Sequence, residues 1–325
     1  MIINTNPEFG IELTLVIPYA YYLHKQGKLD KVVTTKDMRP LYYFCDDVEE
    51  AYTSRTVNNE AAGLGDVPND WIYGDKAGAE LYKDIWHDWK SFMNDSKGCG
   101  ILDYSEWEFP PYGTHYKKSL SHLTNGKPYI VITNRYNHEH GHPPTNYFTE
   151  EALKEMFTGL TERGYAVIYK RPKNTEFALD ENEQITISDN SIPPLNDRML
   201  PAQFPDVYLF DDLLDGALDT TYNEFQMDLF ANAAGFVGMG GGGTLFASAF
   251  GKPTVGYWGL YMSEANRENF FENEDGIVNK YNYHFMINPK LKAVSDPEGH
   301  EQKTDYKIFN QIVFKEFTGD KNENS

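Results

Sequence analysis

A run of four glycines is the feature of this sequence with the clearest chemical use. The run comprises Gly240, Gly241, Gly242 and Gly243, and Thr244 follows it. Glycine adopts positive φ readily and lets a ligand approach the bare backbone. Backbone amides in such a turn, placed where a helix begins, attract anions, so the run predicts a site for a diphosphate. A tight turn without a ligand is the alternative, although four glycines lose more backbone entropy than a plain turn requires.

Polar and basic side chains elsewhere could complete a site for group transfer. Asn134 and Arg135 follow a β-branched stretch, residues 129–133, and Lys170 and Arg171 end the next such stretch. Cations at the ends of parallel strands would meet the glycine run at one edge of a sheet, where they could neutralise a diphosphate. Solvation at the surface is the alternative for each of them, and Arg135 is the strongest candidate because it comes directly off a strand.

Two glutamates have a chemical role and a structural alternative. Glu12 opens an apolar helical pattern and could act as a general base. Its alternative is a first-turn carboxylate that favours the helix dipole. Glu224 could bind ribose hydroxyls, but it stands three residues after Thr221, the spacing of a capping box.

One loop carries three histidines that could gather around a metal ion, although no clear fourth ligand is present. They are His138, His140 and His142. Hydrogen bonding to a donor or an acceptor is the alternative use of this loop.

Composition limits the classes of partner. The chain has 325 residues and a formal net charge of −20, which would repel nucleic acid and anionic membranes. Its two cysteines, Cys45 and Cys99, are too few for a disulfide framework and indicate a reducing compartment. No stretch has the charge pattern of a signal peptide or the apolar length of a membrane span. We therefore expect a cytoplasmic protein, with peripheral membrane contact left open.

The second half of the chain alternates strands and helices. Thr221 caps a helix, a strand follows at residues 235–238, and Thr244 and Gly251 are expected to cap and end the next helix. Further strands are expected at residues 129–133, 165–169, 207–210 and 253–257. Residues 180–197 are acidic and without clear periodicity, which predicts a surface insertion.

The first half has the same pattern in a less regular form. Strands are expected at residues 1–4, 31–35 and 40–44, residues 46–70 are expected to be irregular, and Pro18 is expected to kink or restart the first helix. We predict an α/β fold of two Rossmann-like domains, residues 1–124 and 125–305, with parallel sheets covered by helices on both faces. Residues 306–325 are expected to form a helix and tail that pack back on the first domain.

These patterns resemble the two-domain GT-B glycosyltransferases, above all the heptosyltransferase-like group. That group has a second-domain loop of the form Gly-x-Asp-x-Gly-x-x-His followed by a helix and Gly-x-Pro-Thr-Val, and residues 238–255 read GMGGGGTLFASAFGKPTV. Its first domain has an acid six residues before a proline, as Glu12 stands before Pro18. Gly240 and Leu245 replace the group's Asp and His, so the backbone cradle is kept while those side-chain contacts are missing. Residues 222–232 also resemble a group of polysaccharide-associated glycosyltransferases.

The resemblance implies a glycosyltransferase of polysaccharide biosynthesis. It would move a sugar from a nucleotide-sugar to a glycan or other hydroxyl acceptor by inversion, with Glu12 as base, no cofactor and no active-site metal. Asn134, Arg135, Lys170, Arg171, Glu224 and the segment from Gly240 to Thr244 would hold the donor. Two alternatives stay open: a nucleotide-sugar epimerase of the same fold, and a non-catalytic module that binds nucleotide-sugars or glycans.

Overall fold

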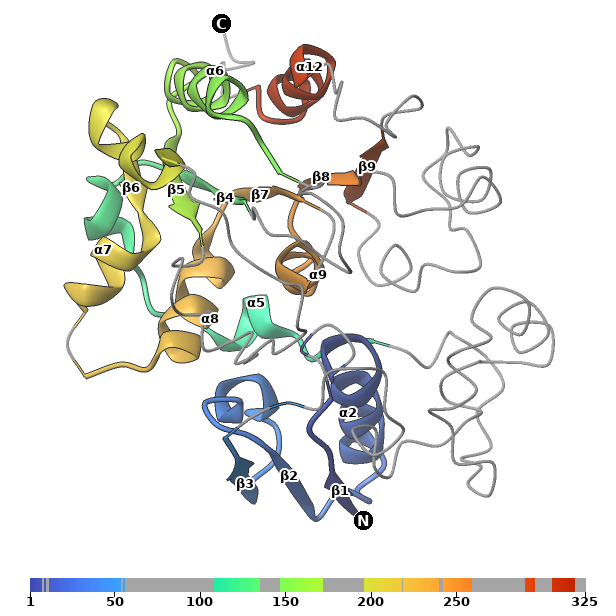
Figure 1. The fold of residues 1–325 in the computed structure, drawn as a ribbon. Helices are drawn as coiled ribbons and strands as arrows, with labels where there is room; N and C mark the ends of the chain where they lie inside the picture. The colour runs from blue at the N-terminus through green and yellow to red at the C-terminus, as the bar shows by residue number, and fades with distance from the viewer. Residues whose placement is uncertain are drawn as a thin grey trace, which may run out of the picture.

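The protein is described by a computed structural model that covers residues 1–7, 9, 12–53, 55, 108–134, 147–171, 196–217, 219–239, 242–258, 290–295 and 306–318. Its strands form two sheets, one of three strands in the order β1-β2-β3 and one of six in the order β6-β5-β4-β7-β8-β9 (Figure 1). Every pair of neighbouring strands in both sheets is parallel. The predicted fold class, α/β with two Rossmann-like units, is confirmed.

The smaller sheet consists of β1 (Ile2–Asn4), β2 (Lys31–Thr35) and β3 (Val48–Tyr52). Between β1 and β2 the chain forms a π-helical turn, η1 (Glu12–Val16), and then α2 (Ile17–Lys25), which has Pro18 in its first turn. The expected restart at Pro18 is therefore confirmed. Proline suits this place because the first-turn amides of a helix have no intrahelical partner.

Two predictions for this unit are wrong. Residues 40–44 are not a strand, because Arg39–Tyr42 form the 3₁₀-helix η2, in which proline at the second position favours helical φ. The stretch expected to be irregular contains β3, whose exposed Glu49 and Glu50 hide the usual apolar alternation. A strand at the edge of a sheet needs only one buried position, here Val48, so its pattern is weak.

The sequence located most strands of the larger sheet well. The strands are β4 (Tyr129–Thr133), β5 (Ala166–Lys170), β6 (Val207–Leu209), β7 (Gly235–Met239), β8 (Thr254–Trp258) and β9 (Leu291–Ser295). All but β9 lie within a residue or two of a predicted strand. Near-continuous runs of Val, Ile and Tyr suit strands that are covered on both faces.

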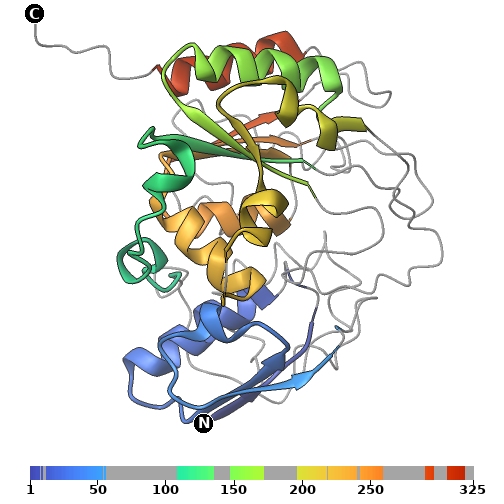
Figure 2. The ribbon, with the colours of Figure 1, turned by 90° about the vertical axis from the view of Figure 1, so that its left-hand side faces the viewer.

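Helices cover both faces of the larger sheet. On the outer face lie α6 (Glu150–Thr161) and α12 (Tyr306–Glu316), and on the face toward the smaller sheet lie α7 (Phe210–Asp215), α8 (Tyr222–Asn232) and α9 (Gly242–Ser248) (Figure 2). The apolar core between the two sheets is continuous. It includes Phe9 of the first unit, whose ring meets that of Phe246 in α9 edge to face at 5.9 Å between centroids.

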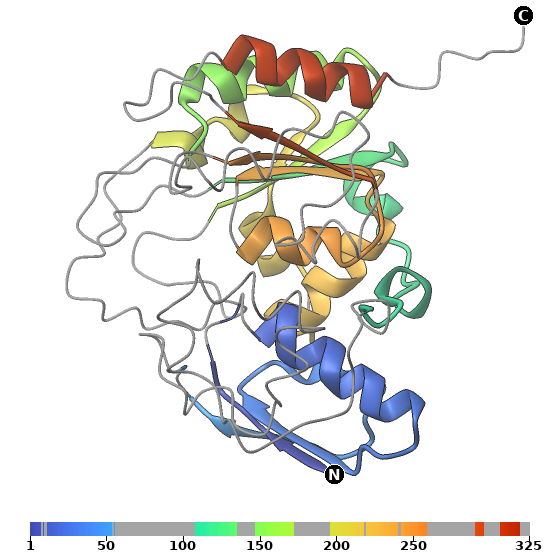
Figure 3. The same ribbon diagram turned by 90° about the vertical axis from the view of Figure 1, so that its right-hand side faces the viewer.

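The last helix does not return to the first unit, so that prediction is wrong. Figure 3 shows α12 beside α6 on the outer layer, far from α2. Asn310 of α12 donates to Glu155 Oε2 at 2.9 Å, and Phe314 lies where a side chain at Gly159 would have to be. Its apolar stripe of Phe309, Val313 and Phe317 completes the core on that face, which would otherwise be exposed.

The connection between the units contacts both of them. The short helix α5 (Tyr112–His115) contacts α8, and Tyr112 Oη donates to the carbonyl oxygen of Leu41 at 2.9 Å. A 3₁₀-turn, η6 (Ser121–Thr124), and positive φ at Asn125 and Gly126 then lead into β4. A division at residues 124 and 125 remains a prediction. No helix in the described part of the chain has the length and apolar character needed to cross a membrane.

Candidate functional site

The site predicted from the sequence lies at the carboxyl edge of the larger sheet. Because its strands are parallel, the residues that follow β4, β5 and β7 leave the sheet at the same edge. Asn134 follows β4, Arg171 follows β5, and the glycine run follows β7. Of the predicted residues, Arg135, Gly240 and Gly241, like the three histidines, lie outside the described residues.

The described end of the glycine run is packed tightly on β4. Gly238, near the end of β7, has no room for a side chain, since an added Cβ would overlap the hydroxyls of Thr133 and Thr244. The helix α9 begins at Gly242, so Thr244 lies inside its first turn rather than at its N-cap, and the expected capping role is wrong. Its buried hydroxyl donates instead to the carbonyl oxygen of Met239, which ties the helix to the strand that precedes it.

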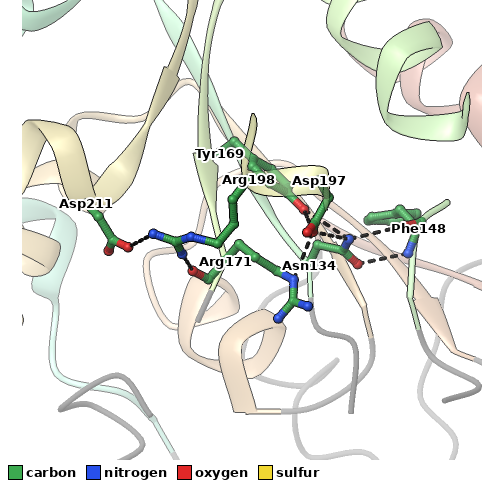
Figure 4. Close-up of polar contacts among 7 residues, drawn as sticks. All are labelled: Asn134, Phe148, Tyr169, Arg171, Asp197, Arg198 and Asp211. Carbon is green, nitrogen blue, oxygen red and sulfur yellow. Dashed lines mark hydrogen bonds and ion pairs between the residues drawn. The ribbon is translucent and has the colours of Figure 1, made fainter. Parts of the chain in front are cut away.

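Two of the predicted donor-site residues, Asn134 and Arg171, meet at a carboxylate that the sequence did not single out. Asp197, in the 3₁₀-turn η7 (Asn196–Met199), is fully buried. Its Oδ2 accepts from Arg171 Nε at 2.8 Å, from Asn134 Nδ2 at 3.4 Å and from the hydroxyl of Tyr169 (Figure 4). We call Asn134, Tyr169, Arg171 and Asp197 the Asp197 centre. Residues 180–197 were expected to be a surface insertion, and for Asp197 this is wrong.

The Asp197 centre contains charges that compensate each other. The side chains of Arg171 and Asp197 are 1% and 0% exposed, so their ion pair is shielded from water. Burial, and then the charge and hydrogen bond of Asp197, raise the pKa of Tyr169 well above its usual value of 10.0. Tyr169 therefore stays protonated and acts as a donor. Outside the centre, Arg198 binds both the carbonyl oxygen of Arg171 and the carboxylate of Asp211.

Lys170 and Glu224 lie away from the Asp197 centre. Side chains alternate along β5, so Lys170 points to the face opposite Tyr169, with its Nζ 5.4 Å from the ring centroid of Tyr222. Glu224 is exposed at the start of α8. The capping role expected for Thr221 is confirmed, since its Oγ1 accepts from the amide of Glu224 at 3.2 Å.

In the first unit, Glu12 is a fully buried carboxylate at the carboxyl edge of the smaller sheet. Its Oε1 accepts from Tyr42 Oη at 2.8 Å and from the hydroxyl of Thr34, and its Oε2 pairs with Arg55 Nη1. We call Glu12, Thr34, Tyr42 and Arg55 the Glu12 centre. Burial, and then the charge of Glu12, raise the pKa of Tyr42, which keeps this hydroxyl protonated.

The Glu12 centre is next to the second unit but enclosed. The turn η1, which carries Glu12, contacts α9, the helix that begins within the glycine run. The guanidinium of Arg55 lies 5.4 Å from the ring centroid of Phe9, and Phe9 packs on Phe246 of α9. The predicted base and the glycine segment are thus brought to the same interface, although no part of the carboxylate is exposed there.

The sequence reasoning missed Asp197 and Arg55. Each is a charged residue in a polar stretch, and only partners far away in sequence make it a buried group. The partners of Asp197 lie 26 to 63 residues away, and the carboxylate partner of Arg55 lies 43 residues away. Such long-range pairing leaves no periodic signal. Among the described residues, no group of three or more His, Cys, Asp or Glu side chains could hold a metal ion.

Comparison with known proteins bears on the fold. No family model matches the sequence, and no curated protein matches it significantly. Among solved structures, E. coli ADP-heptose LPS heptosyltransferase II aligns at 11% identity and a TM-score of 0.54, over 98% of this chain and 98% of that chain. E. coli heptosyltransferase WaaC with ADP-2-deoxy-2-fluoro heptose aligns at 10% identity and a TM-score of 0.50, over 97% and 98%. Over nearly its whole length, the chain has the two-domain GT-B fold of these heptosyltransferases.

Proposed function

We propose that this protein is a glycosyltransferase that moves a sugar from a nucleotide-sugar to a hydroxyl group of a glycan or another acceptor. The observation that carries the proposal is the edge of the larger sheet, where Asn134, Arg171 and the start of α9 come together in a GT-B fold. Heptosyltransferase WaaC, which has the same fold, was solved with ADP-2-deoxy-2-fluoro heptose. This supports a nucleotide-sugar as the class of donor. In the cell we expect a cytoplasmic enzyme of polysaccharide biosynthesis.

The donor's diphosphate is proposed to lie on the segment from Gly240 to Thr244. Backbone amides at a helix start provide positive partial charge without a side chain. Side-chain charge is less available, because Arg171 is already paired with Asp197 and Lys170 lies over Tyr222. We therefore assign the diphosphate mainly to the backbone, with Asn134, Arg135, Lys170 and Arg171 around it and Glu224 toward the ribose.

Glu12 is proposed as the general base of an inverting transfer that uses no metal. A base must reach the proton of the acceptor hydroxyl, within about 2.6–3.2 Å between heavy atoms. In the structure the carboxylate already receives hydrogen bonds from Thr34, Tyr42 and Arg55. An acceptor hydroxyl therefore has to displace one of these donors or join Arg55 at Oε2.

This enclosure also supports a second candidate function, a nucleotide-sugar-binding module without transfer activity. In such a module Glu12 would be a structural ion-pair partner of Arg55, and its burial would need no opening. Gly240 and Leu245, at positions where the resembling family has Asp and His, fit the same candidate.

The test is ligand binding followed by turnover. The protein is screened by thermal shift against nucleoside diphosphates and nucleotide-sugars, because a ligand at 100 times its Kd raises the free energy of unfolding by about 2.7 kcal/mol. A nucleotide-sugar that stabilises the protein is then tested for transfer and hydrolysis. Binding with turnover supports the transferase, binding without turnover supports the module, and no binding to any nucleotide rejects both.

A further inference from the structure

We propose that Asp197 is a positioning residue that locks the ends of β4 and β5 together at the carboxyl edge of the larger sheet. Through Asn134 and Arg171 it fixes the place where the donor nucleotide is proposed to bind. That the bound ligand is a donor nucleotide rests on the proposed function, but the positioning of the strand ends by Asp197 does not.

The geometry of one oxygen atom carries the inference. Asp197 Oδ2 receives Asn134 Nδ2 from the end of β4, and Arg171 Nε and the Tyr169 hydroxyl from β5 and its end. The same Asn134 Nδ2 also lies 3.0 Å from Tyr169 Oη. A single carboxylate is therefore bound by side chains from both strands, and it is fully buried. Hydrogen bonds to a charged group are stronger than neutral ones, especially where water is excluded.

The partners of Asp197 also hold the backbone at Phe148, just before α6, and at Arg171. Asn134 is bonded twice to the backbone of Phe148: its Oδ1 accepts from the Phe148 amide at 2.8 Å, and its Nδ2 donates to the Phe148 carbonyl oxygen at 3.2 Å. Arg171 is held in the same way, by Asp197 on its side chain and by Arg198 on its carbonyl oxygen. The centre thus fixes four backbone positions, those of residues 134, 148, 171 and 197.

Neutrality of the pair explains why position, rather than charge, is the contribution of Asp197. The positive charge of Arg171 is balanced by a carboxylate 2.8 Å away in a site closed to water. A buried pair of this kind adds no net charge for an anion to feel. The pair provides a fixed geometry instead. Separating the partners would leave each buried charge uncompensated, so the two side chains stay in contact.

The experiment compares Asp197→Asn with a matched control, Asp206→Asn. Asp206 pairs with Lys127 Nζ at 2.8 Å at the opposite, amino edge of the same sheet. Hydrogen exchange of the ligand-free protein is followed at the Phe148 amide and in residues 166–171. Asp197→Asn is expected to speed exchange there roughly tenfold or more by local opening, with β7 unaffected, while Asp206→Asn leaves these amides unchanged.

Nucleotide binding is then measured by titration calorimetry with ADP and UDP. For whichever of them binds the wild-type protein, Asp197→Asn is expected to raise Kd roughly tenfold, because small misplacements of binding groups weaken binding steeply. Asp206→Asn should stay within about twofold of wild type. If neither nucleotide binds the wild-type protein, the exchange data alone decide on positioning, and the donor proposal is decided by the wider thermal-shift screen.

Two outcomes overturn the inference: wild-type exchange at Phe148 and residues 166–171 in folded Asp197→Asn, or nucleotide affinity unchanged despite faster exchange. If Asp197→Asn does not fold, Tyr169→Phe replaces it, since this change keeps the ion pair and removes one donor. Faster exchange at Phe148 in Tyr169→Phe then supports the inference, and unchanged exchange rejects it.

Discussion

The two centres of the molecule, around Glu12 and Asp197, have the same chemical plan in different places. Each has a fully buried carboxylate, an arginine paired with it and a tyrosine hydroxyl that donates to it. Each lies at the carboxyl edge of a parallel sheet, where ligands of α/β proteins usually bind.

The centres differ in how the two oxygens of the buried carboxylate are bonded. In the Glu12 centre both carboxylate oxygens are bonded, and within the described part of the chain Arg55 Nε and Nη2 find no partner. In the Asp197 centre three donors share Oδ2, and Oδ1 finds no partner among the same residues. Among the described residues, the Glu12 carboxylate is therefore bonded at both oxygens, whereas the Asp197 carboxylate keeps a spare acceptor. Buried polar atoms without partners are costly, so they mark places where water or a ligand group would be stabilised.

The location of each centre indicates which of them is suited to chemistry. The Asp197 centre connects two strands of one sheet and fits a scaffold role. The Glu12 centre includes the first residue of η1, and η1 contacts α9. The centre therefore lies where the two units meet. The Glu12 centre is therefore the better candidate for catalysis.

Replacing the proposed base should have the largest effect on turnover. Glu12→Gln keeps the size of the side chain but removes the basic oxygen, so turnover is expected to fall about 10²–10⁴-fold while donor affinity is nearly unchanged. Steady-state kinetics and donor titration measure the two quantities. The acidic limb of the pH–rate profile should disappear as well. A variant that keeps most of its turnover would show that Glu12 is a structural residue like Asp197.

Breaking the ion pair of the Glu12 centre should have the largest effect on stability. Arg55→Ala leaves the Glu12 carboxylate buried and uncompensated, which is expected to lower the free energy of unfolding by about 3–5 kcal/mol. Urea unfolding measures the change. The control is Lys31→Ala, which removes the partially exposed pair with Glu49 and should lower the free energy of unfolding far less, because solvent screens that pair. Equal effects of the two variants would contradict the burial argument.

Adding one methyl group to β7 should disturb the second unit alone. In Gly238→Ala the new Cβ meets Thr133 and Thr244, and overpacking of this kind is expected to cost about 1–3 kcal/mol of unfolding free energy. Nucleotide binding should weaken too, because α9 must shift. The double variant with Thr133→Ser still carries the clashing hydroxyl, so it should not recover stability, whereas the double variant with Thr133→Ala loses that hydroxyl and should recover part of it.

The sequence predicted the elements of the second unit well because their signals are local. Residues 129–133 form a β-branched run, and Thr149 and Thr221 stand where helix caps are needed, as the structure confirms. In the first unit, exposed Glu49 and Glu50 concealed a strand, and Pro40 turned a strand-like run into a 3₁₀-helix.

The candidate site was predicted only in part. The positions of Asn134 and Arg171 after parallel strands follow from local pattern, so their meeting at one edge could be expected. Asp197 could not, because its burial depends on partners from β4 and β5, far away in sequence. The docking of α12 on α6 was missed for a similar reason, since an apolar stripe does not say which of two sheets it will cover.

The smallest expected effect is an alkaline loss of stability shared by the two centres. Burial first, and then the neighbouring carboxylate, raise the pKa of Tyr42 and Tyr169 above the value of 10.0 expected in the unfolded chain. Below pH 10 both hydroxyls are protonated in either state, and their contribution to stability is complete. Above it the unfolded chain releases these protons while the folded chain keeps them, so the free energy of unfolding falls as pH rises, by up to about 1.4 kcal/mol per pH unit for each tyrosine. Urea unfolding at pH 9 and pH 11 measures this loss. Tyr42→Phe and Tyr169→Phe should each reduce it by a similar amount, and a reduction by only one of them would show that the two centres are not equivalent in the folded protein.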